Sequence, residues 1–115
     1  MNKFLHYEAE LMLLETYTGF TRLTAVYKEA MTGSDTELSY LGLGLVGEAG
    51  EVANELKRSY RLENNIIDKQ KVLFELGDLF WYWIRLCDAL NFDPEDVIKA
   101  NKDKLTKRRG ESFVS

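Results

Sequence analysis

The chain has 115 residues, a formal net charge of −4 and one cysteine, and 45% of its residues are hydrophobic while 30% are charged. This composition is typical of a single soluble globular domain and excludes a disordered chain. One cysteine cannot form an internal disulfide, so we expect Cys87, which stands in an apolar run, to be a small buried hydrophobic residue. The acidic net charge disfavours broad electrostatic binding to nucleic acid.

The first residues predict neither a secretory signal nor a membrane anchor. Glu8 and Glu10 interrupt the apolar run that a signal peptide needs, and no apolar run in the chain approaches the length that crosses a bilayer. We therefore expect no membrane association, and a cytoplasmic location as the default.

The sequence predicts an all-α fold, a bundle of four to five helices, because it holds one proline and few alternating apolar runs. Apolar residues near helical spacing predict helix over about residues 3–31, as one helix or two. A second helix is expected over about residues 36–62. Ser34 or Asp35 can cap it, and Glu37 lies three residues beyond Ser34, as a capping box requires.

A third helix is predicted over about residues 69–90 with Asp68 as its cap, and a last helix runs from the Asp93-Pro94 start signal to about residue 108. The third helix is apolar nearly all round, which indicates burial on more than one side. In so short a chain this favours a homo-oligomer. We interpret residues 1–110 as one helical domain and residues 111–115 as a loose C-terminal tail.

Two acidic pairs stand out, each with its members three residues apart on a predicted helix. Glu48 and Glu51 form the first pair and Glu75 and Asp78 the second, and Glu55 extends the strip of the first. Both pairs lie beside a glycine at the margin of an apolar stripe. Carboxylates gathered there are partly desolvated and repel one another, so they need a cation or basic groups to neutralise them.

The short connection between the second and third helices favours antiparallel packing, which brings the two pairs together. Ligation by oxygen alone suits a hard cation, so we predict Mg²⁺, with Mn²⁺ as a substitute. The single histidine, His6, is not expected to be a ligand. With the Lys and Arg residues of the last helix nearby, the arrangement favours attack of water on a phosphate anhydride.

Four glycines in the second helix, at positions 42, 44, 47 and 50, each cost about 1 kcal/mol relative to alanine. We expect them to allow close approach of another helix or of a ligand. Plainer interpretations exist for the other features. An acidic pair at helical spacing is usually a solvated face, and the basic residues of the last helix also fit the helix macrodipole. The aromatic run Trp81-Tyr82-Trp83 fits a core or interface better than a base-stacking platform.

Two segments of the sequence together resemble a known family. GEAGEVANELK followed by ELGDLFWYW is similar to the MazG-like branch of the all-α nucleoside triphosphate pyrophosphohydrolases, in which Glu-x-x-Glu is followed, after a spacer, by Glu-x-x-Asp. The ending ANKDKLTKRR resembles the family's Asn-x-x-Lys-x-x-x-Arg segment, which corresponds to Asn101, Lys104 and Arg108. The sequence after Arg108 reads Arg109-Gly110-Glu111 and lacks the Tyr-Pro often found there.

The resemblance implies cleavage of a nucleoside triphosphate between the α and β phosphates, giving the monophosphate and pyrophosphate. Mg²⁺ is then held by the four matched carboxylates, and Glu48 or Glu51 acts as the base. Lys104 and Arg108 neutralise phosphate oxygens, while Asn101 contacts substrate or orients a ligand. It also implies a dimer or tetramer with the site near a subunit interface, and a role in clearing unwanted nucleotides.

An alternative is a non-catalytic helical oligomer that binds nucleotide or a protein partner. It predicts neither Mg²⁺ binding nor turnover, and the presence of all four ligand positions weighs against it. A di-iron carboxylate bundle is more remote, because that site needs histidines three residues after glutamates.

Overall fold

The computed structural model describes residues 12–61 and 66–110, and within these ranges it contains four helices and no strand. The helices are α1 (Leu14–Thr24), α2 (Asp35–Arg61), α3 (Lys69–Ala89) and α4 (Pro94–Arg109). The all-α prediction is confirmed. The expectations about His6 and the tail at 111–115 fall outside the described residues.

The predicted starts of α3 and α4 are confirmed by their caps. The side chain of Asp68 accepts a hydrogen bond from the Lys71 backbone N–H at 3.2 Å, and Asp93 accepts one from the Glu95 N–H at 2.9 Å. Pro94 is the first residue of α4, where its missing N–H costs nothing. These local signals explain why α3 and α4 begin where the sequence predicts.

The predicted end of α3 is also confirmed. Asn91 adopts a left-handed conformation with φ 63°, its N–H bonds to the Asp88 carbonyl, and the Phe92 N–H bonds to the Cys87 carbonyl at 2.8 Å. This is the Schellman pattern, which stops a helix and turns the chain sharply. The turn sets the direction in which α4 leaves α3.

The predicted helix over residues 3–31 is confirmed as α1 from Leu14 to Thr24 and is wrong beyond Thr24. The part of this prediction before residue 12 lies outside the described residues. Glu29 and Met31 have positive φ angles of 67° and 69°, which a helix cannot contain. The Glu37 carboxylate accepts hydrogen bonds from the backbone N–H groups of Met31 and Gly33, each at 2.8 Å. A side chain from the next helix therefore fixes this segment as a turn, overriding the helical spacing of its apolar residues.

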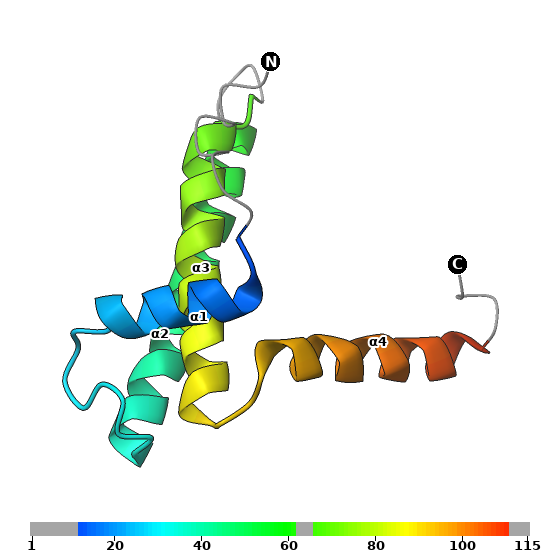
Figure 1. The fold of residues 1–115 in the computed structure, drawn as a ribbon. Helices are drawn as coiled ribbons and strands as arrows, with labels where there is room; N and C mark the ends of the chain where they lie inside the picture. Colours follow the sequence, from blue (N-terminus) through cyan, green and yellow to red (C-terminus); the bar gives the residue numbers. More distant parts are fainter. Residues whose placement is uncertain (1–11, 62–65, 111–115) are drawn as a thin grey trace.

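The arrangement of the helices is simple. α2 and α3 form an antiparallel hairpin, α1 crosses α3, and α4 starts at the lower end of α3 and projects away from the other three (Figure 1). Among the described residues, the buried hydrophobic core consists of Leu41, Ile84 and Cys87. The expectation for Cys87 is thus confirmed. None of the described helices combines the length and the apolarity that crossing a membrane requires.

One of the four glycines of α2 explains how closely the hairpin packs. A Cβ atom built on Gly44 would lie 2.1 Å from Cε1 of Tyr82, so the ring occupies the space that any other residue would fill. Gly42, Gly47 and Gly50 have no such neighbour among the described residues. Close helix approach is therefore the reason for Gly44 alone.

A charged network joins three elements at the lower end of the hairpin. Arg85 and Glu37 are fully buried and form an ion pair at 3.7 Å, and Glu37 also accepts a hydrogen bond from the Tyr27 hydroxyl. Arg85 binds Asp88 at 2.6 Å, and Arg22 of α1 binds the same carboxylate through two nitrogens. The network fastens α1 and the turn after it to both helices of the hairpin.

Candidate metal centre

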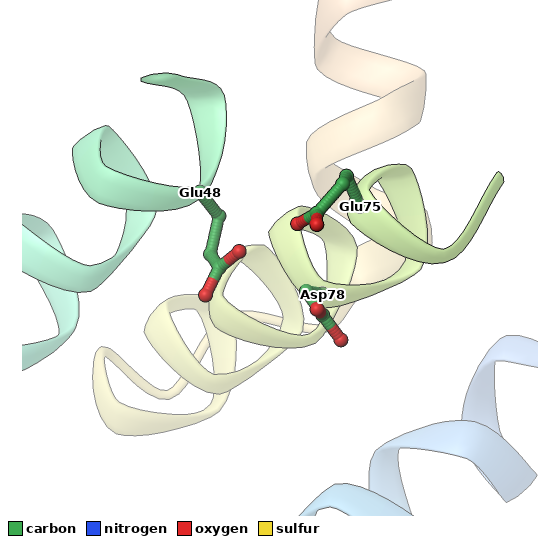
Figure 2. Close-up of side chains that lie close together, drawn as sticks. All are labelled: Glu48, Glu75 and Asp78. Carbon is green, nitrogen blue, oxygen red and sulfur yellow. The ribbon is translucent and has the colours of Figure 1, made fainter. Parts of the chain in front are cut away.

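Three of the four predicted carboxylates converge. One oxygen from each of Glu48, Glu75 and Asp78 lies within 4.8 Å of the others. In Figure 2, Glu48 extends from α2 toward Glu75 on α3, with Asp78 one turn further along α3. The hairpin accounts for this: antiparallel α2 and α3 place these positions side by side at their crossing. We refer to these three residues as the acidic cluster.

The acidic cluster is electrostatically strained without a cation. Burial raises the pKa of Glu48, and the negative charges of Asp78, Glu75 and Glu51 raise it further, as does a hydrogen bond between Glu48 and Glu75. Each of these effects disfavours the ionised carboxylate. A cation placed among the carboxylate oxygens would instead favour the ionised form of Glu48.

The negative charges of the acidic cluster also raise the pKa values of two tyrosines, Tyr82 and Tyr17. A hydrogen bond with Tyr40, followed by burial and the nearby charges of Glu48 and Asp78, raises the pKa of Tyr82 to about 12. Burial and the charge of Asp78 raise the pKa of Tyr17 on α1. The field of the acidic cluster therefore reaches both the hairpin interface and α1.

The fourth predicted ligand, Glu51, lies outside the acidic cluster. It is exposed on α2, but its charge still acts on Glu48. Glu55, the next acid on that strip, forms an ion pair with Arg58 at 3.0 Å. The strip predicted from helical spacing is therefore divided: Glu48 enters the cluster, Glu51 borders it, and Glu55 is paired elsewhere.

The predicted substrate-binding residues are not brought to the acidic cluster by the fold of one chain. Asn101, Lys104 and Arg108 are exposed on α4, which projects from the hairpin (Figure 1). Sequence spacing alone places them correctly on one helix, but the direction of that helix depends on the turn at Asn91.

The donor set of the acidic cluster fits a hard divalent cation. All of its ligand atoms are carboxylate oxygens, which Mg²⁺ and Mn²⁺ prefer. Oxygens on opposite sides of a Mg²⁺ ion lie about 4.2 Å apart, twice the metal–oxygen distance. One oxygen from each carboxylate of the acidic cluster lies within 4.8 Å of the others, a separation comparable with this value.

Comparison with known protein families places this chain in one of them. The family model of the MazG nucleotide pyrophosphohydrolase domain matches residues 36–113. The chain belongs to this family. A MazG domain indicates nucleotide pyrophosphohydrolase activity, and the matched range contains every site residue predicted above.

Two relatives are similar over most of their own length. The Gene 37 protein of Mycobacterium phage L5 is 36% identical over 95 residues, which cover 79% of this chain and 83% of the phage protein. The uncharacterized protein YvdC of Bacillus subtilis (strain 168) is 36% identical over 73 residues, covering 56% of this chain and 68% of that protein. No solved structure matches the chain significantly.

Two features of this chain are not predicted from its sequence. The first is the buried network, although Arg85, which directly follows the apolar run Leu79–Ile84 of α3, indicates a buried acidic partner. The second is Tyr17, which lies outside the family match and yet is close enough to Asp78 for the charge of that carboxylate to raise its pKa. No local pattern predicts the second, because it depends on how α1 crosses α3.

Proposed function

We propose that this MazG protein is a Mg²⁺-dependent pyrophosphohydrolase that cleaves ribo- or deoxyribonucleoside triphosphates between the α and β phosphates, and so clears unwanted nucleotides. The observation that carries the proposal is the convergence of Glu48, Glu75 and Asp78 in a chain of this family. The carboxylates of the acidic cluster repel one another, and a cation bound to the substrate's phosphates would neutralise them.

In the proposed reaction, Glu48, Glu75 and Asp78 hold the cation and so fix the triphosphate beside α2 and α3. The cation, when bound, neutralises phosphate oxygens and lowers the pKa of the attacking water. The water oxygen bonds to the α phosphorus, the bond to the bridging oxygen breaks, and pyrophosphate leaves with the electron pair. Glu51, which borders the cluster without joining it, takes the proton of the water.

We further propose that a second copy of the chain completes the site. The α4 residues Lys104 and Arg108 are exposed on a helix that projects away from the acidic cluster of their own chain, while neutralising the α, β and γ phosphates needs positive charge near that cluster. Large apolar side chains remain exposed on α2, among them Leu43 (75% exposed) and Val46 (69%). A dimer or tetramer would cover such surfaces.

The experiment is pyrophosphate release from a panel of nucleoside triphosphates, with Mg²⁺ and with chelator, joined to calorimetric titration of Mg²⁺. Glu75→Gln should lose both turnover and Mg²⁺ binding. Glu51→Gln should lose turnover and keep Mg²⁺ binding, because its oxygens lie outside the cluster. Glu55→Gln is the matched control: it carries the same change on the same helix, in a residue paired with Arg58, and should keep both.

Two outcomes would refute parts of this proposal. Turnover that survives in Glu75→Gln would remove the acidic cluster as the catalytic centre. No turnover of any triphosphate and no Mg²⁺ binding by the parent would favour the alternative, a helical oligomer that binds nucleotide or a partner without catalysis. Mixing Glu75→Gln with Lys104→Ala tests the assembly, because only a site shared between copies regains activity when the two variants combine.

A further inference from the structure

A very close contact between α2 and α3 lies one helical turn from the acidic cluster. The ring of Tyr82 fills the space in which Gly44 would carry a Cβ atom. Gly44 stands four residues before Glu48 on α2. Tyr82 stands four residues after Asp78 on α3. Because the two helices run antiparallel, this contact lies about 6 Å along the hairpin from the carboxylates of the acidic cluster.

The neighbouring rings restrict the movement of the Tyr82 ring. The ring of Tyr40 on α2 lies 6.2 Å away, and its hydroxyl shares a hydrogen bond with that of Tyr82. Trp81 packs against Tyr82 at 5.1 Å with the two ring planes nearly perpendicular. Tyr27 stacks on Tyr40 at 4.7 Å and packs on Trp81 at 6.2 Å, which joins the four rings into one cluster. A side chain at residue 44 must therefore push α2 away from α3.

The displacement that a methyl group at residue 44 would cause is similar to the size difference between two common cations. The added Cβ would lie 2.1 Å from a ring carbon. Carbon atoms in contact are about 3.5–4.0 Å apart, so the helices would separate by about 1 Å or more at this point. Oxygens on opposite sides of a bound ion are about 4.2 Å apart for Mg²⁺ and about 4.6–5.2 Å apart for Ca²⁺. A shift of this size therefore decides which of the two ions fits.

The ligands of the acidic cluster are divided between the two helices, which is why the helix spacing matters. Glu48 comes from α2, whereas Glu75 and Asp78 come from α3 (Figure 2). Moving α2 outward carries Glu48 away from the other two carboxylates. Mg²⁺ requires nearly ideal octahedral geometry at short distances, while Ca²⁺ accepts longer and more variable distances. A wider hairpin therefore weakens Mg²⁺ binding more than Ca²⁺ binding.

We propose that the Gly44–Tyr82 contact fixes the distance between α2 and α3 and thereby makes the acidic cluster select Mg²⁺ over the larger Ca²⁺. This inference rests on the proposed function, in which the acidic cluster holds a divalent cation. Gly44 and Tyr82 are positioning residues, since they act through the carboxylates. A larger ion at the same place would lie further from the phosphate and water oxygens and would polarise them less.

The test is calorimetric titration of Mg²⁺ and of Ca²⁺, each alone, into the parent and four variants. Gly44→Ala forces the helices apart, and Tyr82→Leu removes the ring. The combined variant lets the new methyl group occupy space that the ring has left. Gly47→Ala is the matched control, because residue 47 stands next to Glu48 and its added Cβ meets no described atom within 4 Å.

The readout is the ratio of the Mg²⁺ affinity to the Ca²⁺ affinity. A smaller folded fraction weakens the apparent binding of both ions by the same factor, so the ratio separates helix spacing from stability. Far-ultraviolet circular dichroism checks that each variant is helical. Tyr82→Leu tests the same contact from the other helix, so the proposal does not depend on the folding of Gly44→Ala.

Gly44→Ala should lower the affinity ratio by about 10- to 100-fold, the usual effect on metal affinity of residues that orient metal ligands. Tyr82→Leu should also lower it, because the gap beside Gly44 leaves the helix spacing unfixed. The combined variant should recover most of the parent's ratio. A contact that served stability alone would predict the reverse, since the combined variant loses more native contacts than Gly44→Ala. Gly47→Ala should keep the parent's ratio.

Three results would overturn the role of the contact alone. The first is an unchanged ratio in Gly44→Ala when the parent binds Mg²⁺. The second is a combined variant whose ratio is lower than that of Gly44→Ala. The third is an equal loss in Gly44→Ala and Gly47→Ala, which would assign the effect to the change from glycine to alanine itself. A parent that binds neither ion would refute the metal centre as well, and if it also turned over no triphosphate, the proposed function would fail with it.

Discussion

Replacing Glu37 by glutamine should be one of the most damaging single changes in this chain. Both oxygens of the buried carboxylate are used: one accepts from the Gly33 N–H, and the other accepts from the Met31 N–H and the Tyr27 hydroxyl. The NH₂ group of glutamine cannot accept, so at least one buried donor loses its partner. The same group would turn its hydrogens toward the guanidinium of Arg85 or toward a backbone N–H.

The size of the effect follows from burial. Glu37 and Arg85 are both 0% exposed, and removing one partner of a buried ion pair costs about 3–5 kcal/mol. A buried donor left unsatisfied contributes about 1–3 kcal/mol of that cost. A domain of this size has a free energy of unfolding of about 5–15 kcal/mol, so the variant would be near its stability threshold.

Urea unfolding followed by far-ultraviolet circular dichroism measures this change, at one fixed protein concentration so that assembly does not alter the comparison. Glu55→Gln is the matched control, since Glu55 lies on the same helix and pairs with the half-exposed Arg58 at 3.0 Å. That surface change should cost at most about 1 kcal/mol. If the two variants lose similar stability, or Glu37→Gln loses less than the control, the network does not hold the turn and the reasoning fails.

Three further predictions follow from particular side chains. Burial raises the pKa of Glu37, but its hydrogen bonds outweigh burial and lower it below the usual value. The contribution of Glu37 to the free energy of unfolding is therefore fully present above the unfolded pKa of about 4.3 and is lost as pH falls through the lower folded pKa. In an acid titration below about pH 4.3, Glu37→Gln should lose stability less steeply than the parent. Gly44→Ala should destabilise by about 1–3 kcal/mol through its clash with Tyr82, whereas Gly47→Ala should stabilise by up to about 1 kcal/mol, and equal unfolding midpoints would contradict the packing. Adding a chelator to the Mg²⁺-bound parent should lower its melting temperature, whereas the melting temperature of Asp78→Asn should not change. Without metal, Asp78→Asn should be at least as stable as the parent, because one of the mutually repelling charges is removed.

Local sequence signals predict most of the helix boundaries. They fail where a side chain from another element determines the backbone conformation. The caps at Asp68 and Asp93 lie within a turn of the helices they start, so they are readable from sequence. The end of α1 depends on Glu37, which reaches back to bind Met31 and Gly33 after the next helix has formed. No periodicity of residues 25–31 contains that information.

The same distinction applies to the candidate site. Helical spacing predicts which acids share a strip, but the crossing of α2 and α3 selects Glu48 for the acidic cluster and leaves Glu51 at its border. The basic residues of α4 lie on the predicted last helix, while the turn at Asn91 directs that helix away from the acids. Spacing fixes positions on one helix, and only packing fixes positions between helices.

Two acids of α2 show how the surroundings of a carboxylate separate a structural role from a functional one. Burial acts on both Glu37 and Glu48 and raises the pKa of each. Around Glu37, a hydroxyl, two backbone N–H groups and an arginine outweigh burial and lower the pKa, so the charge is fully satisfied. Around Glu48 the principal neighbours are further carboxylates, which raise the pKa further. The first acid needs nothing more to remain ionised, and the second needs a cation, which is why we propose that Glu48 is a metal ligand and that Glu37 stabilises the fold.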